Sequence, residues 1–389
     1  MSEWRKVKFL DLFALPSRNG LTKPSRVRGS GYKMINMGEL FSNGRIYDIP
    51  MELVPLNDKE KEVAKVERYD LLFARQSLVL EGAGKCSIVM DVSDLTTFES
   101  HLIRVRLDYN IANPLFYYYY FSSSLSPISS IVSQCAQAGI KGSDLVQIMV
   151  DFPPLHIQHR IATILSRYDS LIENYQKQIK LLDESAQRLY KEWFIDLRFP
   201  GHENTKIVDG VPEGWEKKKV GNLISKVLRT KQVSANNYLN SGCIPVIDQS
   251  RNYIAGYTND LESLVEVTIP YIVFGDHTRV LKYVPFSFAK GADGTQLVMS
   301  NDLERMPQSL FYNSLIEIDL SNYSYARHFK YLKEESILVP SKDIAQKYDK
   351  VVSQYCQSIQ KSRDQIRHLT EARDRLLPKL MSGEVIVNR

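Results

Sequence analysis

The stretch IQHRIATILSRYDSLIENYQKQIKLLDESAQRLYKEW occupies residues 157–193 and recurs, in diverged form, as IAQKYDKVVSQYCQSIQKSRDQIRHLTEARDRLLPKL at residues 344–380. The two segments align without a gap, and most of the positions that they share are apolar or aromatic. The shared positions include Ile157/Ile344, Tyr168/Tyr355, Ile172/Ile359, Ile179/Ile366, Leu182/Leu369, Glu184/Glu371, Arg188/Arg375 and Leu189/Leu376. Because a repeated unit constrains the architecture before any single motif is interpreted, we predict two copies of one long helix.

The sequence around the helices also repeats. A proline precedes each copy at the same distance, Pro153 and Pro340, where its fixed φ angle suits a strand or loop that enters a helix. The segment Trp4–Leu12 recurs as Trp215–Leu223, whereas the sequence between this segment and the helix differs strongly in the two halves. The chain is therefore predicted to be built from two related halves.

The predicted fold class is α+β, with a pseudo-two-fold repeat. Two globular mixed α/β domains are separated by two long antiparallel coiled-coil helices. We expect the first domain at residues 1–152, a central helix at 153–199, the second domain at 200–339 and a C-terminal helix at 340–389.

The apolar residues of the first helix recur in steps of three and four, which predicts a coiled-coil seam. This seam comprises Ile157, Ile161, Ile164, Tyr168, Leu171 and Tyr175, and then, after an extra step of four that indicates a stutter, Ile179, Leu182, Ala186, Leu189 and Trp193. The second copy has Ser358, Ser362 and Arg373 at seam positions, so we expect its seam to be less well packed.

Four apolar residues of the first helix lie off this seam, and we expect them to be exposed. They are Leu165, Ile172, Leu181 and Tyr190. An exposed apolar face of this kind favours docking of a further helical partner. The alternative is that the helices only brace a two-domain enzyme.

Composition indicates a globular protein with a modest positive charge. Lys and Arg number 50 against 45 Asp and Glu, a net charge of +5 that suits a polyanionic partner. No signal peptide or membrane-length apolar run is found, so we expect a soluble, cytoplasmic protein without a membrane partner. The four cysteines are dispersed and indicate neither disulfides nor a zinc site.

Catalytic signatures are incomplete. Residues 82–87, GAGKCS, lack the first glycine and the hydroxyl of a phosphate-binding loop, and residues 151–155, DFPPL, depart from the Asp-Pro-Pro-Tyr loop of amino-methyltransferases. The glycines of the basic segment 26–33 do not complete a dinucleotide-binding motif, and the histidines show no metal-ligand spacing. We therefore expect no catalytic residue, no metal and no cofactor in this chain.

Several motifs, read together with the repeat, resemble the type I restriction-modification specificity subunit of the HsdS type. In the first half they are DLLFARQS at 70–77, TFESHLIRV at 97–105 and FPPLHIQHRIA at 152–162; in the second half they are VFGDHTR at 273–279, GADGT at 291–295 and LLPKLMSGE at 376–384. The resemblance spans nearly the whole chain. One departure is AQK at 345–347, where the first copy has QHR at 158–160.

The resemblance implies a DNA sequence-recognition subunit without catalytic activity of its own. Each domain would read one half of a bipartite target in double-stranded DNA, and the helices would dock two methylating subunits. It also implies restriction subunits as further possible partners. S-adenosylmethionine, and ATP and magnesium where a nuclease subunit is present, would belong to the partner subunits.

Direct readout of bases needs forked or amide side chains on a stable frame, and such residues follow a strand-like run in each half. The predicted DNA-binding residues are Arg75, Gln76 and Ser77 after the first run, His277, Thr278 and Arg279 after the second, and Lys141, Arg251 and Asn252 in polar loops. The alternatives are a salt bridge or a strand-end cap for the strand-end residues and simple solvation for the loop residues.

Two other functions stay open at this point. One is a self-contained, site-specific DNA methyltransferase or nuclease with duplicated domains, for which the motifs are missing. The other is a coiled-coil scaffold without DNA binding, which would show no salt-dependent affinity for a duplex.

Overall fold

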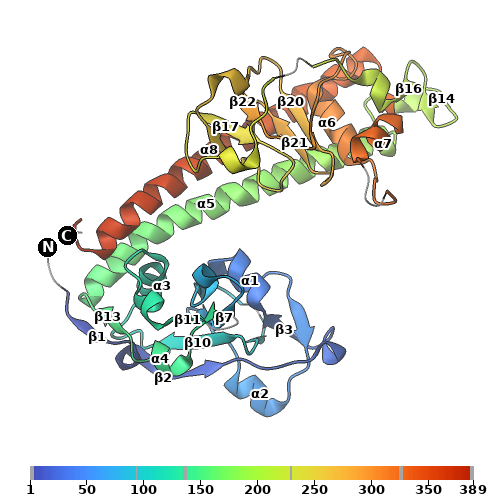
Figure 1. Cartoon of the computed structure of the whole chain (residues 1–389). Coiled ribbons are helices and arrows are strands. Elements are labelled where there is room, and N and C mark those ends of the chain that lie inside the picture. The colour runs from blue at the N-terminus through green and yellow to red at the C-terminus, as the bar shows by residue number, and fades with distance from the viewer. Residues whose placement is uncertain (1–3, 93, 135–137, 228–229, 324–326, 386–389) are drawn as a thin grey trace. The chain divides into compact units, whose positions relative to one another are not determined.

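The computed structural model describes residues 4–92, 94–134, 138–227, 230–323 and 327–385 (Figure 1). The chain divides into two compact units. The first unit contains residues 1–172 and 367–389, and the second contains residues 173–366. Each unit therefore includes one globular domain and one end of each long helix, α5 (Leu155–Tyr190) and α8 (Lys342–Met381).

The first unit is organised around a five-stranded sheet. The strand order is β2 (Phe13–Asn19), β10 (Leu102–Leu107), β6 (Leu71–Ala74), β8 (Cys86–Val89) and β4 (Arg45–Ile46). The central strand β6 is antiparallel to both β10 and β8. All four of its residues are buried, which explains why its sequence is apolar throughout rather than alternating.

Aromatic side chains fill the core beneath this sheet. Helix α3 (Pro114–Ser122) contributes most of them. The ring centroid of its Phe121 lies 5.1 Å from the ring centroid of Phe73 on β6. A separate three-stranded sheet has the order β5 (Glu52–Val54), β3 (Tyr32–Ile35) and β9 (Thr96–Phe98). Beside it lies the short helix α1 (Met37–Ser42), which begins directly after β3.

The second unit has a similar central strand. Strand β20 (Tyr271–Gly275) lies between β21 (Leu281–Val284) and β23 (Thr295–Val298) and is antiparallel to both. A four-stranded sheet has the order β18 (Gly256–Thr258), β17 (Ile244–Ile247), β22 (Phe288–Lys290) and β19 (Leu264–Val265). Helices α6 (Gln308–Ile316) and α7 (His328–Glu334) complete the unit.

The ends of the two domains show the pseudo-repeat in atomic register. Strand β1 (Lys6–Lys8) pairs with β13 (Met149–Asp151), and β16 (Glu216–Lys219) pairs with β24 (Ser336–Val339). Lys6 lies opposite Asp151, and Lys217 lies opposite Leu338. Trp4–Leu12 recurs 211 residues later in the chain, and residues 157–193 recur 187 residues later. Adding 211 to Lys6 gives Lys217, and adding 187 to Asp151 gives Leu338, so the same positions pair in both halves and the predicted repeat is confirmed.

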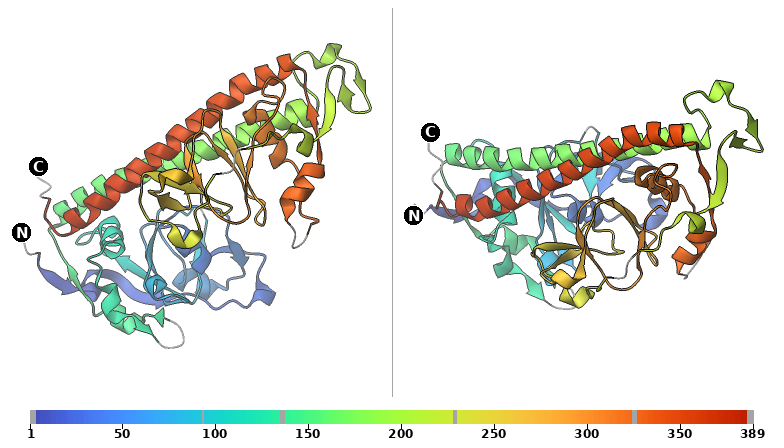
Figure 2. Two further views of the ribbon diagram at one scale, coloured as in Figure 1. Left: turned by 45° about the horizontal axis from the view of Figure 1, so that its top comes forward. Right: turned by 90° about the horizontal axis from the view of Figure 1, so that it is seen from above.

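Within each unit, α5 and α8 lie side by side and run in opposite directions (Figures 1 and 2). In the first unit, Arg373 of α8 forms an ion pair with Asp169 of α5. In the second unit, the hydroxyl of Tyr348 on α8 donates to the carbonyl of Ala186 on α5. The predicted antiparallel helix pair is therefore confirmed, and no described helix is both long and apolar enough to cross a membrane.

The predicted exposure of the first helix is wrong at three positions. Leu165, Ile172 and Tyr190 are buried within the chain, whereas Leu181 is 61% exposed as expected and Leu171, assigned to the seam, is 47% exposed. Leu165 belongs to the core of the first domain and Tyr190 to that of the second. The helix contacts a domain as well as its partner helix, and periodicity alone cannot separate these two contacts.

Candidate nucleic-acid interface

The loop after β6 is the first predicted DNA-binding segment, and the backbone holds it tightly. The amide of Arg75 donates to the carbonyl of His101 at 2.7 Å, and the carbonyl of Arg75 accepts from the amide of Ile140 at 2.9 Å. The next residues form β7 (Gln76–Ser77), which pairs with β12 (Ala138–Gly139). Lys141 follows this pairing directly, so the fold brings it to the same loop.

The polar side chains of this loop differ in availability. Arg75 and Gln76 are half-buried and Lys141 is exposed. Across the described ranges, neither the guanidinium of Arg75 nor the amide of Gln76 has a hydrogen-bond or ion-pair partner, so the salt-bridge alternative gains no support. Ser77 is different, because it is buried and its hydroxyl accepts from the amide of Val79 at 3.2 Å. This hydrogen bond lies within the turn that follows β7.

The corresponding loop after β20 is fixed by a buried carboxylate. Asp276 accepts from the amide of Phe329 at 2.8 Å, at the start of α7. The next three residues, the predicted DNA-binding His277, Thr278 and Arg279, are exposed. Arg279 has a φ of 62°, in the left-handed region, and its guanidinium donates to the carbonyl of Leu320 at 3.1 Å.

Gln249 is a central residue of this second site that the sequence did not single out. Its side-chain oxygen accepts from the amide of His277 at 3.1 Å, and its side-chain nitrogen donates to the carbonyl of Asp293 at 3.0 Å. Its carbonyl accepts from the hydroxyl of Thr278 at 2.6 Å. Gln249 thus joins three loops, and its position two residues before the predicted Arg251 was the only sequence signal for it.

Lys282 of β21 stabilises the loop that carries Arg251 and Asn252. This lysine is 4% exposed, and its ammonium donates to the carbonyls of Asp248, at 2.8 Å, and Asn252. Burial lowers the pKa of Lys282 to about 8, against the opposing effect of Asp248. The side chains of Arg251 and Asn252 remain exposed. The predicted DNA-binding residues therefore lie on two described loops of the second unit, at 251–252 and 277–279, and around the loop after β6 in the first unit.

Chemistry elsewhere in the described ranges is limited. No group of three or more His, Cys, Asp or Glu residues there is placed to hold a metal ion. Cys86 is buried in the first core, and this burial raises the pKa of its thiol.

Comparison with known proteins agrees with these features. Residues 1–183 match the family model described as the type I restriction modification DNA specificity domain. The chain is 26% identical over 321 residues to the type I restriction enzyme MjaIX specificity subunit of Methanocaldococcus jannaschii, which covers 75% of this chain and 73% of that protein. It is 24% identical over 182 residues to the EcoKI specificity subunit of Escherichia coli, which covers 46% of this chain and 39% of that protein.

The fold also has a counterpart among solved structures. The type I restriction-modification system S subunit from M. genitalium superimposes with a TM-score of 0.62 over 97% of this chain and 96% of that one, at 18% identity. This similarity concerns the fold alone. Both sequence relatives are named as specificity subunits of type I restriction enzymes. Together with the repeated frame and the polar loops that follow β6 and β20, these matches make the chain similar to type I restriction-modification specificity subunits, with the family model matched by residues 1–183.

Proposed function

We propose that this chain is the DNA sequence-recognition subunit of a type I restriction-modification complex, in which each domain reads one half of a bipartite target in double-stranded DNA. The target-recognition domains are residues 1–152 and 200–339, and the helices at 153–199 and 340–389 are the spacers. The observation that carries this proposal is that the paired strands at the ends of the two domains repeat, whereas the loops after the central strands differ. The β1/β13 and β16/β24 ladders repeat in register, whereas the loops after β6 and β20 carry different polar side chains.

The chemistry of the loops fits readout of base edges. Arginine binds guanine through two parallel hydrogen bonds, and glutamine binds adenine in the same way. Arg75 and Gln76 offer these two groups on a loop that the backbone fixes at both sides. The exposed Lys141 and Arg251 suit phosphates, whose contacts give affinity without sequence information.

The partners in this proposal are two methylating subunits that dock on the helix pair. Leu181 supports this assignment, because it lies on the surface of the helix and is 61% exposed. A leucine exposed to this extent is available to a protein partner. S-adenosylmethionine would be bound by the methylating subunits. ATP and magnesium would be needed only with restriction subunits, and the complex would act in the cytoplasm.

The test is selection of target duplexes from a random-sequence library by the chain assembled with its methylating subunits. The expected result is two specific blocks of base pairs separated by a spacer of fixed length and free sequence. A single uninterrupted block would contradict the two-reader model, and salt-independent or absent DNA binding would favour a scaffold. The pure chain should neither methylate nor cut DNA, and turnover by it would favour the enzyme alternative.

A further inference from the structure

An open pocket lies beside the reading loop of the first unit. Its volume is about 420 Å³, and most of its wall is apolar. The lining residues are Met37, Gly38 and Phe41 of α1, Gln76, Ser77 and Leu78 of the loop after β6, and His101. The pocket therefore joins the predicted Gln76 to a group of apolar side chains that the sequence did not connect with it.

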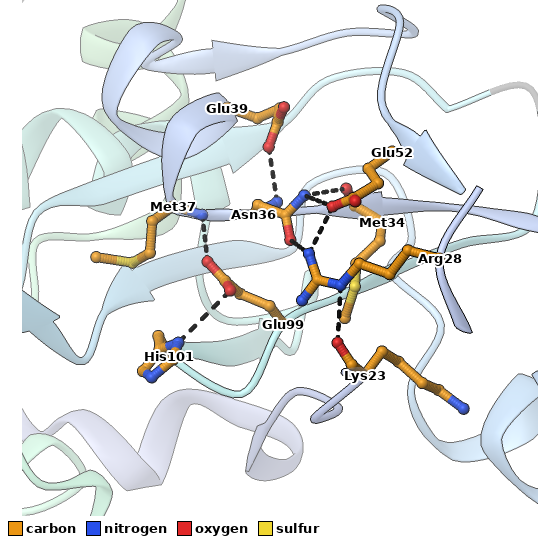
Figure 3. Close-up of polar contacts among 9 residues, drawn as sticks. All are labelled: Lys23, Arg28, Met34, Asn36, Met37, Glu39, Glu52, Glu99 and His101. Atoms are coloured by element: carbon orange, nitrogen blue, oxygen red, sulfur yellow. Dashed lines mark hydrogen bonds and ion pairs between the residues drawn. The ribbon is translucent and has the colours of Figure 1, made fainter. Parts of the chain in front are cut away.

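The walls of this pocket are fixed by a carboxylate. Glu99 accepts from the backbone amide of Met37 and lies 3.5 Å from the ring nitrogen Nδ1 of His101. Figure 3 shows Glu99 between these two residues, with the Asn36 and Glu39 pair that caps α1 next to Met37. Two sides of the pocket are thus positioned before any ligand arrives.

Leu78 and Gln76 are the unusual members of the lining. Leu78 is 89% exposed, although a leucine side chain is apolar throughout. Gln76 is half-buried, and its amide has no hydrogen-bond partner among the residues that the structure describes. Among the residues that the structure describes, no core cluster includes these two side chains, so both are available to a ligand that has an apolar group next to a donor and an acceptor.

An A·T base pair has these groups on its major-groove edge. On adenine, N7 accepts from the nitrogen of a glutamine amide and the N6 amino group donates to its oxygen, and thymine presents a methyl group. The surroundings suit DNA, because Arg75 and Lys141 flank the loop and the ammonium of Lys85 lies 5.1 Å from the ring of Phe41. The positive charge around an apolar pocket favours the base edge of a polyanion over a neutral apolar surface.

We propose that the pocket formed by α1, Gln76, Leu78 and His101 recognises an A·T base pair, with Gln76 bound to adenine and the 5-methyl group of thymine in contact with Leu78 and Met37. This proposal rests on the proposed DNA-reading function. It adds which base pair the first domain reads and which side chains distinguish thymine from the other bases.

The experiment removes only the methyl group. Each thymine of the selected target duplex is replaced singly by deoxyuridine, and binding by the full chain assembled with its methylating subunits is measured. One replacement, in one half of the target, should weaken binding about three- to fivefold, the effect expected for burial of one methyl group. In the Leu78→Ala variant the same replacement should have a smaller effect, because only the contact with Met37 remains. Leu10→Ala is the matched control, since Leu10 is an exposed leucine outside the pocket, and it should retain the wild-type preference for thymine.

The Leu78→Ala variant should keep the fold, because Leu78 is almost fully exposed. A target half that the first domain reads but that contains no methyl-sensitive thymine would overturn the proposal. So would a thymine preference that persists undiminished in both Leu78→Ala and Met37→Ala. Both of these results leave selective DNA binding in place. Loss of selectivity for every duplex by the wild-type complex is a different outcome, which would overturn the proposed function together with the pocket.

Discussion

Arg373 of α8 and Asp169 of α5 form a partly buried ion pair in the first unit, with 2.6 Å between Nη1 and Oδ1. The second carboxylate oxygen of Asp169 accepts from the hydroxyl of Tyr119 at 2.6 Å. The arginine interrupts the apolar seam of the second helix copy, where a poorly packed position was expected from the sequence. The structure instead shows that the charge of Arg373 is paired with that of Asp169. Such a pair favours one register of the two helices over registers shifted along the helix axis.

Replacing Arg373 with methionine should destabilise the first unit. Removing one partner of a buried ion pair leaves the other charge uncompensated, and the expected loss lies near the lower end of about 3–5 kcal/mol because Arg373 is partly exposed. Adding Asp169→Asn should recover most of this loss, since the asparagine oxygen still accepts from Tyr119 and no charge remains. Urea denaturation of the two single variants and the double variant measures the coupling. Purely additive losses would show that the pair contributes nothing specific.

Replacing Arg75 with alanine should relax selectivity at one base pair in one half of the target only. If the guanidinium holds a guanine edge, the loss should be about 1–3 kcal/mol at that position. Lys141→Ala is the contrasting variant, because an exposed phosphate-binding lysine should weaken all duplexes alike and reduce the salt dependence. Binding to duplexes varied singly across both halves, at two salt concentrations, separates the two outcomes. Relaxed selectivity in both halves at once would contradict the two-reader model.

The buried Lys282 predicts a pH dependence with a definite sign. Lysine ordinarily loses its proton near 10.5, and burial lowers this pKa to about 8 in the folded chain. Between these values the unfolded chain binds more protons than the folded chain, so the free energy of unfolding contributed by Lys282 rises with pH. Relative to that of Lys282→Met, the free energy of unfolding of the wild-type chain should rise by on the order of 1–2 kcal/mol between pH 8 and 9.5.

Lys231→Met is the matched control for this measurement. Hydrogen bonds and charges of Asp260 and Glu262 raise the pKa of Lys231, so it stays protonated in both states over this range. The difference between wild type and Lys231→Met should therefore be flat with pH. A difference for Lys282→Met that is also flat, or that falls with pH, would contradict the assignment of a charged, buried ammonium at this loop.

Leu181→Asp should weaken docking of the methylating subunit and leave the fold unchanged. Leu181 is 61% exposed, so a charge at this position costs the free chain little. Gln176→Asp, another exposed position of α5, is the control for a general effect of charge. Co-purification reports docking and thermal unfolding reports the fold. If Leu181→Asp still co-purifies fully, the docking surface lies elsewhere on the chain.

The paired strands and long helices of this protein can be predicted from its amino-acid sequence. The repeated segments at 157–193 and 344–380 predicted two long helices, and the recurrence of Trp4–Leu12 located the paired strands, down to Lys6 opposite Asp151 and Lys217 opposite Leu338. These features depend on local periodicity and on comparison of the chain with itself. The motifs around Arg75 and His277 also located the two loops that follow the central strands, because a run of buried apolar residues ends at each.

Which side chains of these helices and loops are exposed depends on tertiary packing and could not be predicted from the sequence. The 3.6-residue period of a helix predicts which residues share a face but not how many neighbours cover that face, so Leu165 and Tyr190 were expected in solvent and are buried. Gln249 and Lys282 act through loops 28 and 34 residues away, a separation over which local pattern carries no information. The burial of a charge or an amide depends on what the rest of the chain packs against it, and this is determined only when the whole domain has folded.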